Sequence, residues 1–259
     1  MDFTVKSYKK LLVALKDFGF GFLPYNVFHL QNDQDKKFIC LRHDVDARKE
    51  NSLEFAKIQH QMGIAGTYYF RTIPQSYDEK VILEMANLGH EIGYHYETMD
   101  TARGHVDNAY DEFVKNLEMF RKIVPITTIC MHGSPLSKFD NRDIWKKYDY
   151  KKLGLIAEPY FDVDFNKTFY LTDTGRRWDG AKVSVRDKAM DANACSNPDF
   201  LSRSYHSTFD IISDLEKKDF PGNVMMTFHP QRWTDDKLLW YKEFFAQNLK
   251  NQIKRILIK

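Results

Sequence analysis

The stretch "KFICLRHDVD", residues 37–46, decides the fold expected for this chain. It begins as a short apolar run and ends in charged side chains. Further short runs rich in apolar or aromatic residues follow along the chain: "GTYYF" (66–70), "HEIGYHY" (90–96), "ITTICM" (126–131), "LGLIAEPY" (153–160), "TFYLT" (168–172) and "VMMTF" (224–228). Runs of this length and composition are typical of buried strands.

Segments with helical spacing lie between these runs. They are "KENSLEFAKIQHQMG" (49–63), "YDEKVILEMANLG" (77–89), "NAYDEFVKNLEMFRKI" (108–123), "NRDIWKKYDY" (141–150) and "STFDIISDLEKKDF" (207–220). This alternation predicts a parallel α/β architecture. Seven strands favour an incomplete barrel, although an open doubly wound sheet would have similar spacing. No repeat or linker divides the chain, so we expect a single domain over residues 1–259, with an amphipathic helix at about 5–18 packed on it.

The polar ends of the runs favour the barrel. Five of them end in functional groups: "RHDVD", "HYE", "MHGSP", "TDTGRRW" and "FHPQRW". A (β/α) barrel presents its catalytic groups at the C-terminal ends of its strands. The sequence therefore predicts a barrel with its site at that edge.

The composition indicates an ordinary globular protein. Of 259 residues, 43% are hydrophobic and 29% are charged, and the net charge of +2 does not favour a nucleic-acid partner. The charged N-terminus does not resemble a signal peptide, and no apolar run approaches the roughly 18 residues of a membrane span. Three widely spaced cysteines indicate reduced thiols. We therefore expect a cytoplasmic protein without a membrane span.

The pair Asp44 and Asp46 is the first candidate for chemistry. The two side chains share one face of a strand, because side chains alternate along it. Carboxylates this close repel each other unless a cation or a shared proton compensates. A metal at Asp46 with Asp44 as the proton acceptor would satisfy both charges. The alternative is that both aspartates belong to the turn and cap the helix that follows.

Histidines provide the remaining candidates. His95 and Glu97 share a strand face by the same alternation, which suggests a metal or acid–base site. His132 follows the fourth run. His229 follows the last run and could donate a proton to a leaving group, or it could be an ordinary hydrogen-bonded residue at a strand end. Mixed oxygen and imidazole ligands predict one divalent metal, zinc before other transition metals.

Together these motifs resemble the polysaccharide deacetylase superfamily (NodB homology, carbohydrate esterase family 4), and particularly its "HDVD" branch. The likeness runs from about residue 36 to 236, with the motifs in family order. It implies a distorted (β/α)7 barrel that removes acetyl groups from N-acetylated sugars with a divalent metal. It also implies that Asp44 is the base, that Asp46 and His95 bind the metal, and that His229 is the acid.

The chain departs from the family pattern at several positions. Met99 stands where the family has a second histidine, and a thioether is a poor ligand for the cations of this chemistry. We predict that Glu97 or His132 completes the metal shell instead. The third motif is "HGSP" rather than an arginine near a proline. The fourth, an aspartate closely followed by tryptophan, is approximated by Asp173 and Trp178.

The expected partner is an acetylated amino sugar or glycan precursor. Trp178, Trp233 and Tyr96 are candidates for stacking on a sugar ring, and each could instead be core packing. Two other classes of function stay open. A catalytically altered barrel could serve as a carbohydrate-binding or scaffold protein, which the loss of histidine at position 99 favours. A non-sugar amidase would use the same constellation.

Three arginines are weaker candidates for substrate binding. Arg176, Arg177 and Arg186 could hold a phosphate or carboxylate of an activated or acidic sugar.

Overall fold

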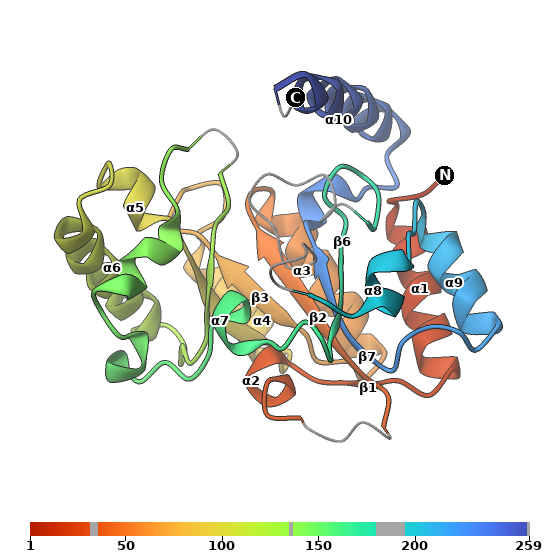
Figure 1. The fold of residues 1–259 in the computed structure, drawn as a ribbon, viewed down its shortest axis with the longest axis horizontal. Coiled ribbons are helices and arrows are strands. Elements are labelled where there is room, and N and C mark those ends of the chain that lie inside the picture. Colours follow the sequence, from red (N-terminus) through yellow and green to blue (C-terminus); the bar gives the residue numbers. More distant parts are fainter. Residues whose placement is uncertain (32–35, 135–136, 180–194, 258–259) are drawn as a thin grey trace.

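The computed structural model describes residues 1–31, 36–134, 137–179 and 195–257, with side chains as far as residue 248. Arg186 lies outside the described residues. The described chain forms a parallel sheet with helices packed around it, and α1 (Val5–Asp17) and α9 (Thr208–Glu216) lie side by side (Figure 1).

All strand pairs in the sheet are parallel. The strands are β1 (Gly21–Phe22), β2 (Phe38–Val45), β3 (Thr67–Phe70), β4 (Glu91–Tyr96), β5 (Ile129–Met131), β6 (Phe169–Thr172) and β7 (Asn223–Phe228). Their order is β5-β4-β3-β2-β7-β6, and β1 pairs with β2 beside the main path. The sheet curls into a half-barrel, which confirms the predicted α/β barrel class.

Helices connect the strands. The remaining α-helices are α2 (Tyr25–Phe28), α3 (Lys49–Gln61), α4 (Glu79–Asn87), α5 (Thr98–Thr101), α6 (Val106–Arg121), α7 (Pro159–Asp162), α8 (Pro198–Ser202) and α10 (Lys237–Leu257). Short 3-10 helices are η1 (Asn141–Lys146), η2 (Tyr150–Leu153) and η4 (Pro230–Arg232). Within these residue ranges, none of the helices combines the length and the hydrophobicity that a bilayer span requires.

Two predicted elements were wrong. The run at 153–160 forms a single bridge from Ala157 to Thr128 rather than a strand. Gly154, with φ 73°, ends η2 in the left-handed region, and Pro159 starts α7, so too few extended residues remain between them. The seventh strand is instead β1. The segment at 141–150 begins as a 3-10 helix rather than an α-helix.

The two faces of β2 have different partners. On the face toward the helices, His43 packs beside Tyr8 of α1 and Gln59 of α3, and all three are buried. Side chains alternate along a strand, so Arg42 and Asp44 point to the inner face of the curled sheet. The inner face of the central strand is therefore charged, and its outer face anchors the helices.

A glycine shapes this inner face at β4. A Cβ atom on Gly93 would lie 2.3 Å from the ring of Tyr69 and 3.0 Å from the carbonyl oxygen of Thr128. Glycine at this position thus lets the Tyr69 ring lie directly over β4, two residues before His95.

Candidate metal and catalytic site

The strand ends bring together the predicted polar residues at one edge of the sheet. Asp46 follows β2, His95 lies near the end of β4, His132 follows β5 and His229 follows β7. Because all strands are parallel, these C-terminal ends meet at the same edge.

Asp44 is held by Arg42, two residues earlier on the same strand face. The Arg42 guanidinium donates from Nε to Oδ1 at 2.9 Å and from Nη2 to Oδ2 at 2.6 Å. Both side chains are almost fully buried, at 2% and 6% exposure. Burial alone would raise the pKa of Asp44, but the charge and hydrogen bonds of Arg42, together with the histidines nearby, outweigh it and hold the pKa well below its usual range. Asp44 is therefore a carboxylate at every working pH.

Asp46 is paired differently. Its Oδ2 accepts a hydrogen bond from Gln231 at 3.1 Å. Its Oδ1 is buried and has no hydrogen-bond partner among the described residues. The Nε2 atoms of His95 and His132 each lie 3.6 Å from that Oδ1, which is too far for a hydrogen bond.

Both imidazoles present Nε2 to Asp46 because Nδ1 is occupied elsewhere. Nδ1 of His95 lies 2.9 Å from the carbonyl oxygen of Cys130, and Nδ1 of His132 lies 2.9 Å from Oε2 of Glu97. The bond to Cys130 fixes the tautomer of His95 that leaves Nε2 with its lone pair, whereas Nδ1 of His132 lies at ion-pair distance from Glu97 without hydrogen-bond geometry. Burial lowers the pKa of His95 to about 4, so this imidazole is neutral at pH 7.

Glu97 lies outside β4 and touches His132 rather than the centre of the site. Arg71 binds both of its oxygens, from Nε at 3.1 Å and from Nη2 at 2.6 Å. Burial would lower the pKa of His132, but the contact with Glu97 and the charge of Asp46 together outweigh it, and the pKa is raised. An ion bound at His132 would compete with a proton, so binding would weaken as the pH falls.

His229 forms a dyad with Asp173, which follows β6. Nδ1 of His229 lies 2.5 Å from Oδ1 of Asp173. The other carboxylate oxygen, Oδ2, accepts from the His229 backbone at 2.8 Å and from Trp233 Nε1 at 2.7 Å. The Nε2 of His229 faces the site, 3.9 Å from Oδ2 of Asp46. Such an arrangement suits a histidine that transfers protons at Nε2.

Asp46, His95 and His132 offer the donor types of a divalent cation, but their three ligand atoms do not all lie within 4.8 Å of one another, so a bound ion would draw the two imidazoles closer together. Two ligands of one tetrahedral zinc lie about 3.4 Å apart for usual bond lengths. The separations of 3.6 Å between Asp46 Oδ1 and each histidine are close to that figure. The unpartnered Oδ1 and the two oriented imidazoles are what a bound ion would satisfy.

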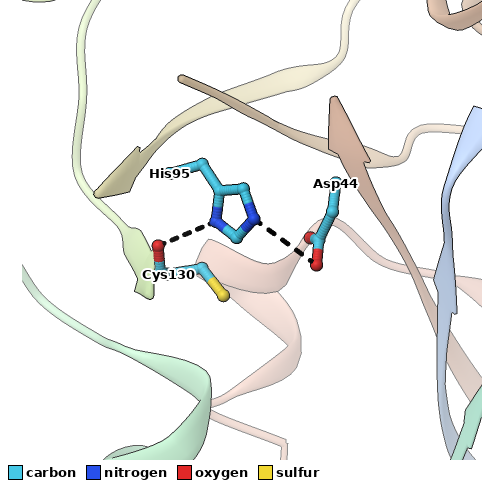
Figure 2. Close-up of side chains that lie close together, drawn as sticks. All are labelled: Asp44, His95 and Cys130. Atoms are coloured by element: carbon cyan, nitrogen blue, oxygen red, sulfur yellow. Dashed lines mark hydrogen bonds and ion pairs between the residues drawn. The ribbon is translucent and has the colours of Figure 1, made fainter. Parts of the chain in front are cut away.

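A second group could also hold a metal. Ligand atoms of Asp44, His95 and Cys130 lie within 4.8 Å of one another, and all three residues are buried. Figure 2 shows the His95 ring between the Cys130 carbonyl and Asp44, whose Oδ2 lies 3.8 Å from Nε2. Here, however, both oxygens of the carboxylate already accept from Arg42, which leaves less charge for an ion.

The predicted sugar-stacking aromatics are core residues in the structure. Trp178, Trp233 and Tyr96 are at most 1% exposed. The Trp178 Nε1 donates to Thr208, and the Tyr96 hydroxyl accepts from Trp145. Their ring faces are covered by protein, so no sugar can stack on them without rearrangement.

The arginines also have other contacts. Arg176 stacks over the ring of Trp240, with its guanidinium carbon 4.6 Å from the centroid, and Arg177 pairs with Asp179. The Arg177 guanidinium is thus occupied by a carboxylate, whereas Nη1 of Arg176 is buried and has no hydrogen-bond partner among the described residues.

Sequence reasoning missed the pairing of Arg42 with Asp44 and that of Arg71 with Glu97. Strand alternation does place Arg42 on the Asp44 face, so the first signal was present. The second joins two residues that each follow a different strand, and it left no signal in the sequence.

Comparisons with known proteins gave only distant likenesses. No protein-family model and no curated protein matches the chain. Among solved structures, a family 4 carbohydrate esterase from Bacillus anthracis is 14% identical, with a TM-score of 0.44, over 92% of this chain and 85% of that one. PdaA of Bacillus subtilis, also a family 4 carbohydrate esterase, is 14% identical, with a TM-score of 0.45, over 93% and 84%.

A family 4 pseudoenzyme from Bacillus anthracis is 10% identical, with a TM-score of 0.45, over 86% of this chain and 63% of that one. At this identity and overlap, these likenesses assign neither function nor residue roles.

Proposed function

We propose that this chain is a metal-dependent hydrolase that removes an acetyl group from an N-acetylated or O-acetylated sugar or glycan precursor. The observation that carries the proposal is the unpartnered Oδ1 of Asp46 between two oriented imidazoles. The order of the sequence motifs supports the choice of acetylated sugars.

The proposed ligands are Asp46, His95 and His132. In this assignment His132 takes the place of the histidine missing at Met99, which is buried. Glu97 orients His132 through Nδ1 instead of binding the ion itself. A divalent cation, zinc before other transition metals, would supply a Lewis acid for the acetyl carbonyl and for the attacking water.

The proposed proton transfers use Asp44 and His229. Asp44 accepts the proton of the attacking water, and Arg42 keeps it in the ionised form that this requires. His229 gives a proton from Nε2 to the departing amine or alkoxide, while Asp173 holds its Nδ1. An amine leaving as an anion is too basic to depart unaided, so amides need this proton more than activated esters do.

A cleft beside His132 offers room for the sugar. It has a volume of about 440 Å³ and is lined by Arg71, Glu97, Asp100, His132, Ser134, Ser137, Lys138 and Phe139. Its lining is mostly polar, which suits the hydroxyl groups of a saccharide.

Metal analysis of purified variants tests the ligand assignment. The parent should carry close to one equivalent of a divalent transition metal. His95→Ala and His132→Ala should lose it, whereas Glu97→Ala should weaken affinity by about 10–100-fold. His60→Ala is the matched control, because His60 is exposed and its Nδ1 bonds to the carbonyl of Leu88, away from the site.

The Cys130→Ser variant separates the two candidate metal groups. If the ion sits on Asp46, this substitution should leave the metal content unchanged. Loss of metal in Cys130→Ser together with retention in His132→Ala would instead favour the group of Asp44, His95 and Cys130.

Acetate release from a panel of acetylated amino sugars and aryl acetates tests the reaction. His229→Ala should retain metal and lose more activity on N-acetyl substrates than on an aryl acetate. A parent that binds metal and releases acetate from none of these compounds would contradict the deacetylase assignment.

A further inference from the structure

The C-terminal helix α10 is attached to the body of the protein by one face of its first turns. The Trp240 Nε1 donates to the carbonyl of Asp2 at 2.6 Å, and Arg176 stacks over the same ring. Glu243 pairs with Arg48 at 3.0 Å. Figure 1 shows the rest of the helix standing apart from those that flank the sheet.

The opposite side of these turns is apolar and exposed. Leu238 is 83% exposed, Tyr241 51% and Phe245 66%. Positions three and four apart lie on the same side of a helix, so these side chains form one stripe. The sequence continues that spacing at Leu249 and Ile253. A stripe of large apolar side chains in water marks an interaction surface.

The charge of the segment indicates what this stripe meets. Residues 237–259 contain six Lys or Arg and one Glu. An amphipathic helix with aromatic and leucine side chains on one face and excess basic residues elsewhere suits the interface of an anionic lipid bilayer. A second copy of the chain would bring two such basic helices together, which like charges oppose.

We propose that α10 binds in the plane of an anionic membrane surface through the stripe of Leu238, Tyr241 and Phe245. Lys237 and Lys242, which belong to the same turns, would lie near the lipid headgroups. Their attraction to the headgroups is electrostatic, so binding should depend on anionic lipid and on salt.

The attachment points of α10 relate this surface to the site. Arg48 comes two residues after Asp46, and Arg176 three residues after Asp173. The helix is thus held at the edge of the sheet where the candidate site lies. A protein bound in this way would turn that edge toward the lipid headgroups. Lipid binding itself needs neither the metal nor the reaction proposed above.

Co-sedimentation with vesicles tests the proposal. The full-length protein is mixed with vesicles of phosphatidylcholine alone or with about a third phosphatidylglycerol, at low and at high salt. Binding should require the anionic lipid and should weaken at high salt. The Leu238→Glu/Phe245→Glu variant should bind at least about tenfold more weakly, because it loses two apolar contacts and gains two repelled charges.

Leu83→Glu is the matched control. Leu83 lies on α4 and is 46% exposed, so this variant adds a charge to an exposed leucine outside the stripe and should bind as the parent does. Metal content and circular dichroism show whether each variant is folded. Absence of binding to the anionic vesicles would overturn the proposal. So would equal binding by the double variant, or a dimer in solution that the double variant dissociates.

Discussion

Replacing Arg42 by Met should lower the free energy of unfolding by about 3–5 kcal/mol, because it leaves the Asp44 carboxylate buried without its partner. Two hydrogen bonds of 2.9 and 2.6 Å are lost, and neither side chain is more than 6% exposed. Water therefore cannot replace the guanidinium without opening the sheet. The measurement is urea unfolding of the metal-free protein, extrapolated to zero denaturant.

A matched pair on the surface provides the control. Arg142 binds Asp140 with the same two-residue spacing, at 3.0 and 2.6 Å, but these side chains are 31% and 26% exposed. Arg142→Met should therefore cost no more than about 1 kcal/mol. The double variant Arg42→Met/Asp44→Asn should recover most of the loss, because it buries no unpaired charge. A cost below about 1 kcal/mol for Arg42→Met would refute the reasoning.

The same pairing affects any test of Asp44 as the base. Asp44→Asn leaves the Arg42 charge buried with only an amide oxygen beside it, so this variant should itself be destabilised. Loss of acetate release in Asp44→Asn is informative only if the protein is folded at the assay temperature, which circular dichroism shows.

Three further predictions follow from buried groups. Burial raises the pKa of Glu158 to about 7 from a usual 4.5, so the folded protein holds this proton more tightly than the unfolded chain does. The resulting stabilisation of the folded state is fully present below about pH 4.5 and is lost as the pH rises through 7. In the parent, the free energy of unfolding measured with urea should fall by about 3 kcal/mol between pH 4 and 8 because of this residue, and Glu158→Gln should remove that fall. An identical pH profile of stability in parent and variant would contradict this prediction. Gly93→Ala should cost about 1–3 kcal/mol, because the new methyl group would overlap the Tyr69 ring; an unchanged melting temperature would argue against that overlap. Asp173→Asn should keep the metal yet slow release from N-acetyl sugars by about 10²-fold or more, with a smaller effect on aryl acetates; equal slowing of both substrates would count against His229 as the acid.

Much of the fold could be predicted because strands and helices of a parallel α/β protein alternate in the sequence. Six of the seven apolar runs form strands, and their polar ends meet at one edge. The strand predicted at 153–160 does not form, because Gly154 and Pro159 interrupt the run. Single residues of this kind outweigh the preference of the surrounding hydrophobic residues for a strand. The helix at 237–257 was not predicted, although its apolar spacing is visible in the sequence.

The site was harder to predict than the fold. Strand ends identify the neighbourhood of Asp46, His95, His132 and His229, but not which atoms face one another. Glu97 was expected to share a strand face with His95; because β4 ends one residue earlier, it turns to His132 instead. Trp178 and Trp233 illustrate a further limit, since a tryptophan beside a motif gives no sign of whether it lines a cleft or fills the core.

The position of β2 in the middle of the sheet sets the order in which this molecule can be assembled during its synthesis. One neighbour, β3, is complete by residue 70, whereas the other, β7, is complete only at residue 228. The three proposed metal ligands all precede residue 133, so they can gather while His229 has yet to be made. For most of translation, one edge of the central strand has no partner and is open to pairing with other chains. A nascent chain of this design should depend on rapid synthesis or on chaperones until its last strand arrives.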